Sequence, residues 1–226
     1  MKNINLIIDF DSTFVKVETL DVLSKISLRN NPNKKHIINE ITSITDDAMN
    51  GRITFDIALS KRIKMLQAKK SDIDNVISLI QGSISTSFIK NKEFFIKNSK
   101  NCYIVSGGFK EIIFPVVNSY GFKNENIFAN TFEIEKNNII DVNQTNPLVK
   151  DKGKVEILKQ HINTNNKDSI ILGDGYTDYE LKKYQTAKYF IQFIENINRK
   201  SLNNKADLIA NNFDNVIEFI NKVNNE

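Results

Sequence analysis

Asp9 and Asp11 close the first apolar stretch of the chain and are followed directly by Ser12 and Thr13. Side chains alternate along a strand, so an extended chain through this point would direct both carboxylates to the same side. Two carboxylates held that close repel each other, and one takes up a proton unless a cation lies between them. Oxygen ligands in a short run suit magnesium. Asp-x-Asp alone is nearly as typical of a strand that ends in a polar turn, so other residues must decide.

Three further segments supply complementary chemistry. Ser106-Gly107-Gly108 leads from a strand into a helix, where glycines let amide groups approach a ligand and the helix start favours an anion. The sequence 152–154 reads Lys-Gly-Lys and offers a positive charge. The turn at 173–178 carries Asp174 and Asp178 four residues apart. Each segment has a simpler reading, as a common turn, a solvated lysine or a helix cap.

Together these residues provide what a carboxylate needs to attack a phosphate dianion. The two groups repel each other because both are negative, and a cation and amide donors offset that repulsion. Asp9 is predicted to be the nucleophile and Asp11 the general acid and base. Mg²⁺ is expected to bridge Asp9, the main-chain carbonyl of Asp11 and Asp174. Asp178 would orient these ligands. The remaining phosphate oxygens are assigned to Ser106, the amides of Gly107 and Gly108, and Lys152.

The pattern of apolar residues predicts an α/β protein with a parallel sheet covered by helices on both faces. Buried strands are expected at 4–8, 103–105 and 169–172, with two short strand–helix pairs after them, at 189–191 and 207–209. Residues 127–142 are expected to form a hairpin, and Pro115 should kink a helix or begin a second one. Ligands bind beyond the carboxyl ends of strands in such sheets, which is where Asp9, Ser106 and Asp174 lie.

Four helical segments in succession, from about residue 16 to 81, interrupt this alternation. We interpret them as a helical cap inserted after the first strand, although a separate helical domain is the alternative. The catalytic core then comprises residues 1–15 and 82–226, and the cap residues 16–81.

Composition narrows the class of protein. The 226 residues carry a net charge of +4 and no dense basic block with aromatics, so neither nucleic acid nor a membrane is an expected partner. The only cysteine is Cys102, and there are two histidines, which excludes disulfides and multi-histidine metal sites. The first apolar stretch is too short for a signal peptide, and no run would span a bilayer, so a cytoplasmic monomer or homodimer is expected.

The four motifs resemble those of haloacid-dehalogenase-type phosphatases over nearly the whole chain. Within that superfamily the closest resemblance is to the phosphoserine phosphatase family. The resemblance implies a Rossmann-like core with a cap, Mg²⁺, an aspartyl-phosphate intermediate and a role in serine biosynthesis. It also implies substrate contacts from the cap. Glu18 matches the residue that receives the substrate ammonium, and Arg62 the one that holds its carboxylate. Met49 and Thr177 match other substrate contacts.

The chain departs from the family pattern at three places. Extra residues near 30–35 lengthen the cap, Pro115 interrupts a helix, and the Lys152/Lys154 doublet leaves two candidates for the phosphate lysine. Lys152 is preferred because a glycine follows it, as in the family motif. The expected activity is hydrolysis of O-phosphoserine to serine and phosphate. The alternatives are another small phosphate ester, or a phospho-acceptor domain without turnover, which would not need Asp11.

Overall fold

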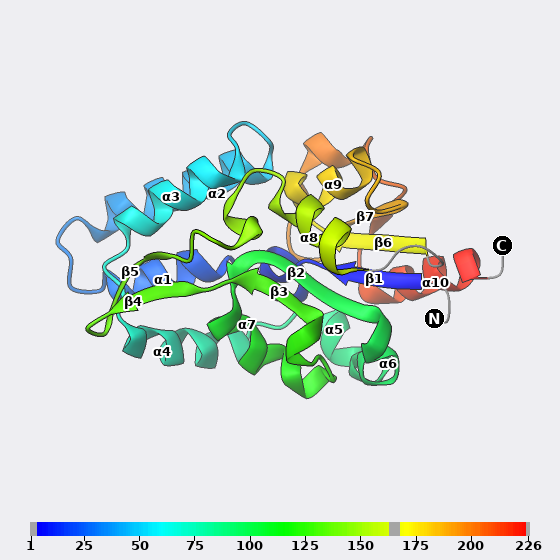
Figure 1. Cartoon of the computed structure of the whole chain (residues 1–226), viewed down its shortest axis with the longest axis horizontal. Helices are drawn as coiled ribbons and strands as arrows, with labels where there is room; N and C mark the ends of the chain where they lie inside the picture. Colours follow the sequence, from blue (N-terminus) through cyan, green and yellow to red (C-terminus); the bar gives the residue numbers. More distant parts are fainter. Residues whose placement is uncertain (1–3, 163–167, 225–226) are drawn as a thin grey trace.

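A six-stranded parallel sheet lies at the centre of the computed structural model, which describes residues 4–162 and 168–224 (Figure 1). The strand order is β3-β2-β1-β6-β7-β8. The strands are β1 (Ile4–Ile8), β2 (Cys102–Phe109), β3 (Ile127–Asn130), β6 (Asp168–Gly173), β7 (Tyr189–Phe193) and β8 (Leu208–Ala210). Because β1 lies between β2 and β6, Asp9 and Asp174, which follow their strands, lie on either side of one strand boundary, and Ser106 lies in the second half of the neighbouring β2.

Alternation along β1 divides the core into two layers. Leu6 and Ile8 belong to the larger apolar cluster, with side chains from α5, α6, α7 and α10. Ile7 belongs to the smaller cluster, with side chains from α8 and α9. Those helices are α5 (Thr86–Lys90), α6 (Lys92–Asn98), α7 (Lys110–Val117), α8 (Gly153–His161), α9 (Tyr176–Lys183) and α10 (Phe213–Asn224). The expected α/β fold with both faces of the sheet covered is therefore confirmed.

A helical cap follows the first strand, as expected. Its helices are α1 (Thr19–Ser27), α2 (Lys34–Met49), α3 (Phe55–Met65) and α4 (Lys70–Gln81). Within the cap, α1 packs on both α2 and α4 (Figure 1). In addition, α4 packs on α7 of the core, and α2 and α3 pack on each other. The exact bounds 16 and 81 stay a prediction.

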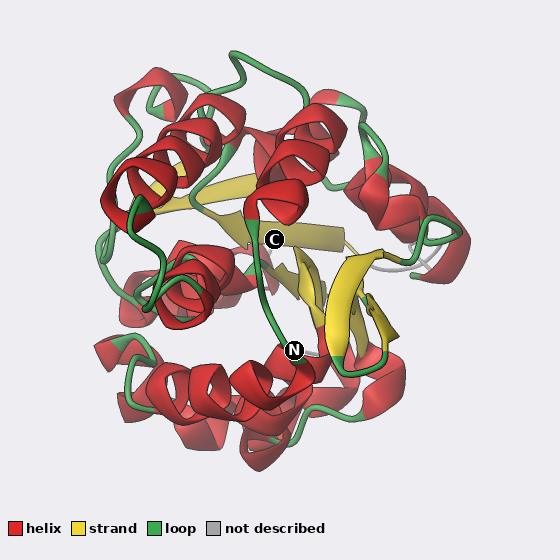
Figure 2. Ribbon diagram, turned by 90° about the vertical axis from the view of Figure 1, so that its left-hand side faces the viewer, coloured by secondary structure: helices red, strands yellow, loops and turns green. Residues whose placement is uncertain are grey.

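The segment 127–142 differs from the expected hairpin. Its first part, β3, joins the main sheet parallel to β2, and only β4 (Phe132–Glu135) and β5 (Asn138–Val142) form an antiparallel hairpin. This hairpin lies beside the cap helices (Figure 2). The N–H of Lys70 donates to the Asn137 carbonyl at 2.9 Å, and the N–H of Ile139 donates to the Ala68 carbonyl at 2.9 Å. The segment between α3 and α4 is thus bonded to the hairpin.

Other differences are local. β2 is longer than expected and runs through the glycines, with an irregular register against β3 between Val105 and Phe109. Pro115 lies inside α7, which ends two residues later at Val117. The connection from β7 to β8 carries only a single helical turn, Lys200–Leu202.

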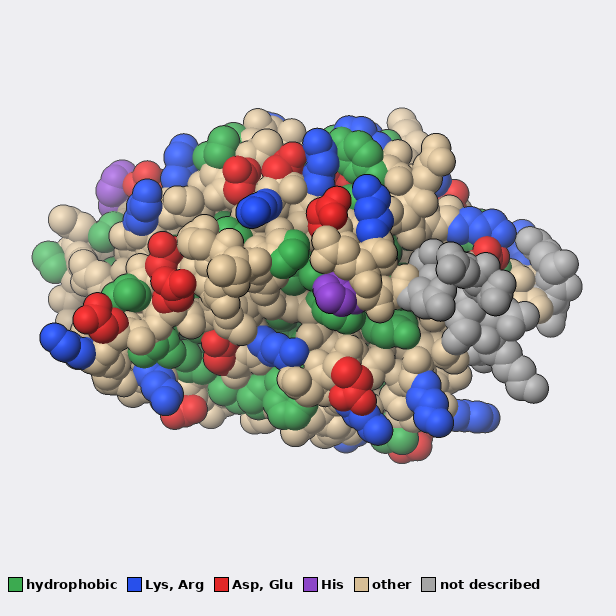
Figure 3. All heavy atoms as spheres, in the orientation of Figure 1, with side chains coloured by type: hydrophobic (Ala, Val, Ile, Leu, Met, Phe, Trp, Pro, Cys, Tyr) green, Lys and Arg blue, Asp and Glu red, His purple; other side chains and the backbone are tan. Residues whose placement is uncertain are grey.

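On the face shown in Figure 3, acidic and basic side chains are interspersed. Within residues 4–162 and 168–224, no helix combines the length and the apolar character that a bilayer span requires.

Candidate active site

The turn after β1 places the first two acids. The N–H of Asp9 donates to the Leu172 carbonyl at 2.9 Å, which fixes Asp9 at the end of the strand. Residues Phe10–Phe14 then form one wide, π-type turn in which Ser12 takes a positive φ of 54°. The side-chain amide of Asn196 donates to the Ser12 carbonyl at 3.0 Å. Asp9 and Asp11 keep extended backbone angles, with ψ of 159° and 139°, and the left-handed conformation begins at Ser12. Asp9 and Asp11 both line the same pocket.

Asp11 faces the cap. Its carboxylate accepts hydrogen bonds from the N–H and the hydroxyl of Thr19, each at 3.1 Å. Burial raises the pKa of Asp11 well above its usual value, and the negative charges of Glu18 and Asp9 raise it further. A raised pKa keeps the proton on a carboxyl group to a higher pH than usual, which suits a general acid.

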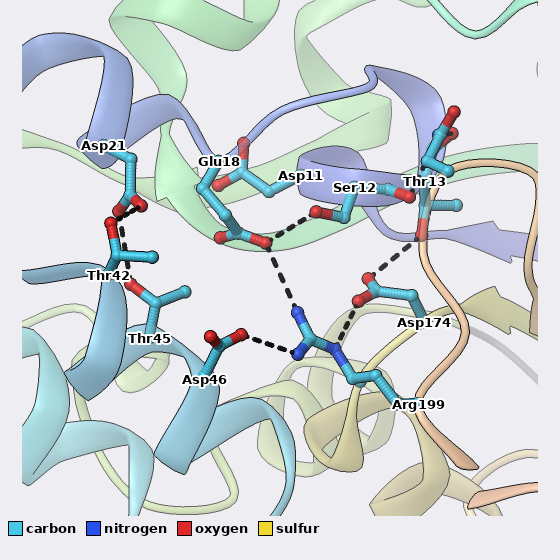
Figure 4. A network of polar contacts seen from close by, with 12 residues as sticks. Asp11, Ser12, Thr13, Glu18, Asp21, Thr42, Thr45, Asp46, Asp174 and Arg199 are labelled. Carbon is cyan, nitrogen blue, oxygen red and sulfur yellow. Dashed lines mark hydrogen bonds and ion pairs between the residues drawn. The ribbon is translucent and has the colours of Figure 1, made fainter. Parts of the chain in front are cut away.

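The turn after β6 places the other two acids. Asp174 is buried, and its Oδ1 accepts a hydrogen bond from the Thr13 hydroxyl at 3.4 Å (Figure 4). Asp178, in the first turn of α9, accepts from the N–H of Gly175 at 3.0 Å. A Cβ at Gly173 would lie 2.2 Å from the Asp178 carboxyl group, so only glycine allows that group to approach the strand.

Asp9, Asp174 and Asp178 form a buried cluster whose ligand atoms lie within 4.8 Å of one another. Burial raises the pKa of Asp174 to about 8, although Arg199 opposes the shift. Burial, with the charge of Asp9, raises the pKa of Asp178 to about 7. The protein's own cations therefore do not fully compensate these carboxylates, so the donor set fits a divalent cation.

Lys154 is the lysine of this cluster. Its Nζ lies 2.8 Å from Asp9 Oδ1 and 2.7 Å from Asp178 Oδ1, with the side chain only 8% exposed. Burial by itself would lower the pKa of Lys154, but the two carboxylates raise it above its usual value. The ammonium group is therefore charged and lies beside the predicted nucleophile.

Lys152, the lysine preferred from the sequence, lies outside this cluster, so the geometry favours Lys154 as the phosphate lysine. Lys152 precedes α8 with a positive φ of 57°, and its half-exposed side chain lies over the Tyr184 ring at 5.2 Å. Gly153 is pressed against residues 147–148, where an added Cβ would lie 2.3 Å from the Pro147 carbonyl oxygen. Gly153 thus lets the start of α8 pack closely on the core, and the side chain of Lys154, the next residue, enters the site.

The strand end of β2 forms the opposite wall. The Ser106 hydroxyl oxygen accepts from the N–H of Gly108 at 3.0 Å. A Cβ at Gly107 would lie 2.3 Å from the ring of Phe55, the first residue of α3. Close packing between cap and core therefore requires glycine at this position.

Glu18 and Arg62 enter the pocket from the cap. The Ser12 hydroxyl donates to Glu18 Oε1 at 2.7 Å. Burial raises the pKa of Glu18, while the charge of Arg62 opposes the shift, so the two groups interact. Arg62 is buried, and one of its terminal nitrogens lies 3.4 Å from Asp21. Its Nε finds no hydrogen-bond partner among the residues that the structure describes.

One pocket brings most of the predicted site together. It is lined by Asp9, Asp11, Glu18, Leu20, Met49, Phe55, Arg62, Ser106, Gly107, Gly108, Lys154 and Thr177. Asp174 and Asp178 lie behind Asp9 in the acidic cluster. Of the predicted site residues, Lys152 lies outside both groups and lines an adjoining hollow.

Arg199 and Asp46 border the acidic cluster, and neither residue was predicted from the sequence. Arg199 Nε donates to Asp174 Oδ2 at 2.8 Å, and its Nη1 donates to Asp46 Oδ1 at 3.1 Å. Figure 4 shows the guanidinium group between the core and α2. Arg199 follows β7 by a few residues, at the same edge of the sheet as the acids. This position after a strand is the feature of the sequence that could have indicated Arg199.

Comparisons with known proteins agree with this geometry, although no protein-family model matches the chain. A phosphoserine phosphatase of Drosophila melanogaster is 28% identical over 211 residues, which cover 91% of this chain and 74% of the relative.

Solved structures show the same fold. A phosphoserine phosphohydrolase-like protein from Francisella tularensis superposes with a TM-score of 0.84 at 28% identity, covering 96% of this chain and 99% of the other. A phosphoserine phosphatase with an analogue of the phospho-aspartyl intermediate gives a TM-score of 0.75 at 25% identity, covering 96% and 98%. The resemblance to phosphoserine phosphatases found in the sequence is therefore confirmed.

Proposed function

We propose that the chain is a magnesium-dependent phosphatase that hydrolyses O-phosphoserine to serine and phosphate, as in serine biosynthesis. The observation that carries the proposal is one pocket in which Asp9, Asp11 and Lys154 face Glu18 and Arg62 of the cap. The first group can transfer a phosphoryl group, and the second can bind an amino acid by both of its charges. The similarity to phosphoserine phosphatases supports the same assignment.

In the first step, a carboxylate oxygen of Asp9 attacks phosphorus and the ester P–O bond breaks. The electrons of that bond leave with the serine oxygen, which takes the proton of Asp11. The raised pKa of Asp11 suits this donation. Asp11 then accepts a proton from a water molecule, whose oxygen attacks the phosphorus of the aspartyl-phosphate. The bond between phosphorus and the Asp9 oxygen breaks, its electrons return to the Asp9 carboxylate, and phosphate is released.

The phosphate is held by groups of the core. Lys154 supplies a positive charge beside Asp9, and the amides of Gly107 and Gly108, together with Ser106, form the facing wall. Asp9, the carbonyl of Asp11 and Asp174 would hold Mg²⁺, and Asp178 would orient the site through Lys154 and Gly175. When bound, Mg²⁺ offsets the negative charge of the phosphoryl group.

Two groups of the cap select the substrate. Glu18 is assigned to the substrate ammonium and Arg62 to its carboxylate, for which the buried Nε of Arg62 is available. Met49 and Thr177 complete the wall around the amino acid.

The test compares two substrates, phosphoserine and an aryl phosphate that lacks both charged groups. Glu18→Gln and Arg62→Ala should each lower kcat/KM for phosphoserine by roughly ten- to hundred-fold, because a charge-assisted contact contributes about 1.5–3 kcal/mol. Hydrolysis of the aryl phosphate should be nearly unchanged.

Equal losses on both substrates would mean that Glu18 and Arg62 support the fold rather than select the substrate. A wild type that hydrolyses the aryl phosphate but not phosphoserine would assign the chemistry to another small phosphate ester. A stable phosphoprotein without turnover would identify a phospho-acceptor domain.

A further inference from the structure

Arg199 is fixed to the core from two directions. Its carbonyl accepts a hydrogen bond from the Gln192 side chain at 2.9 Å, which holds the loop after β7. Its Nε donates to Asp174 at 2.8 Å. The Arg199 side chain is 3% exposed and that of Asp174 1%. The hydrogen bond between Arg199 Nε and Asp174 is therefore charge-assisted and enclosed within the core.

The other end of the guanidinium group reaches the cap. Nη1 lies 3.1 Å from Oδ1 of Asp46, in the last turn of α2, and Nη2 lies 3.8 Å from Oε1 of Glu18 (Figure 4). The Asp46 side chain is 50% exposed. Among the residues that the structure describes, this contact with Asp46 is the ion pair that joins α2 to the core.

The pocket beneath α2 and α3 is small in this arrangement. Its cavity measures about 20 Å³, which is room for one or two water molecules. A phosphorylated amino acid can enter only if the cap and core separate. Other contacts between the cap and the core here carry no charge. They include a hydrogen bond from the Ser201 hydroxyl to Asn50 Oδ1 at 3.2 Å, and the packing of Phe55 at Gly107 and of Met49 at Gly175. Contacts of this kind can part without leaving a buried charge unpaired.

We propose that Arg199 and Asp46 form a latch that holds α2 closed over the site. Arg199 stays bonded to Asp174 when the cap opens, and Asp46 moves into solvent, where its carboxylate is hydrated. Opening then breaks the half-exposed ion pair and leaves the enclosed one intact. The effect of the latch on turnover rests on the proposed function, whereas the opening of the cap does not.

Hydrogen exchange of the substrate-free protein tests the latch directly. Asp46→Lys places a cation against Arg199 and should speed exchange of the amides of α2 by about two- to ten-fold. Asp46 is near the C-terminus of α2, where a lysine favours the helix dipole, so without a latch the same substitution should slow exchange. Glu40→Lys makes the same charge change on the exposed side of α2 and should leave exchange at Asp46 and its neighbours unchanged.

The role of Arg199 is tested by a double-mutant cycle. In an Arg199→Gln background, Asp46→Lys should no longer speed exchange, because the opposing cation is gone. An effect of Asp46→Lys that is equal in both backgrounds, or slower exchange in Asp46→Lys alone, would overturn the latch.

Kinetics with phosphoserine give an independent readout. Asp46→Lys should raise KM by about two- to ten-fold relative to Glu40→Lys, because closure contributes to substrate binding. Faster exchange with no such rise in KM would mean that the latch holds the cap in the substrate-free protein but does not contribute to substrate binding. Loss of the exchange effect refutes the latch even if phosphoserine is hydrolysed, whereas a wild type inactive on phosphoserine refutes only the proposed function.

Discussion

Lys154→Met separates the two lysines of the doublet at 152 and 154 and tests which of them holds the phosphate. Methionine keeps most of the length of the side chain and removes the charge that lies 2.8 Å from Asp9 and 2.7 Å from Asp178. Breaking a buried ion pair by removing one partner costs about 3–5 kcal/mol. If that compensation is needed in the transition state, kcat/KM should fall by roughly two to four orders of magnitude.

Lys152→Met is the matched control. The Lys152 side chain is about half exposed and pairs with Asp151 at 3.5 Å, outside the acidic cluster. Its loss should change kcat/KM by less than about two-fold. A larger loss in Lys152→Met than in Lys154→Met would refute the assignment of the phosphate lysine from this geometry.

The pH dependence of stability gives a second readout that needs no turnover. In Mg²⁺-free protein, the pKa of Asp178 is raised to about 7 even with Lys154 present. Without Lys154 it must rise further, so the folded variant binds more protons than the unfolded chain at pH 8 and loses stability as the pH rises. Urea unfolding should therefore show a larger loss for Lys154→Met at pH 8 than at pH 5. An equal loss at both values would mean that the lysine does not compensate Asp178.

Three further predictions concern the chemistry and the cap. Burial, Glu18 and Asp9 raise the pKa of Asp11, so kcat/KM should fall as the pH rises through this raised pKa. Asp11→Asn should remove that fall together with most of the turnover, and an unchanged pH profile in the variant would assign the proton to another group. A chelator should abolish activity and Mg²⁺ should restore it, with little recovery in Ca²⁺ because of its larger, looser coordination shell; full activity of a verified metal-free sample would contradict this. Gly107→Ala should raise KM by about ten-fold or more while the core still folds, because the new Cβ would lie 2.3 Å from the Phe55 ring; normal kinetics would show that the cap closes without this contact.

Much of the site could be predicted because its acids lie at the ends of buried strands. Strand ends are readable from an apolar run that stops at a polar turn, and parallel topology brings such ends together. Asp9, Ser106 and Asp174 were located in this way, and the structure places them on adjacent strands. The path of the chain beyond each strand was less predictable. The turn after Asp9 depends on Ser12 with its positive φ and on Asn196, which is far away in the sequence.

The choice between Lys152 and Lys154 depends on backbone conformation that the sequence does not state. Both lysines flank Gly153, and only the packing of that glycine against Pro147 decides which one points inward. Arg199 belongs to no local motif, because its role arises from contacts with Asp174 and Asp46 across long sequence separations. Helices α5 and α6 were missed because they are short, and their apolar residues show little periodicity.

The hydrogen bonds that join the β4–β5 hairpin to Ala68 and Lys70 of the cap limit which segments can be swapped between related proteins. A chimaera that receives a foreign segment in place of residues 16–81 would have to present matching groups to the carbonyl of Asn137 and the N–H of Ile139. Ile139 is buried beside them, so a mismatch would also uncover apolar surface. The transplantable unit is therefore the four helices together with residues 132–142, although the two pieces are separated by the first helices of the core and two strands of the sheet.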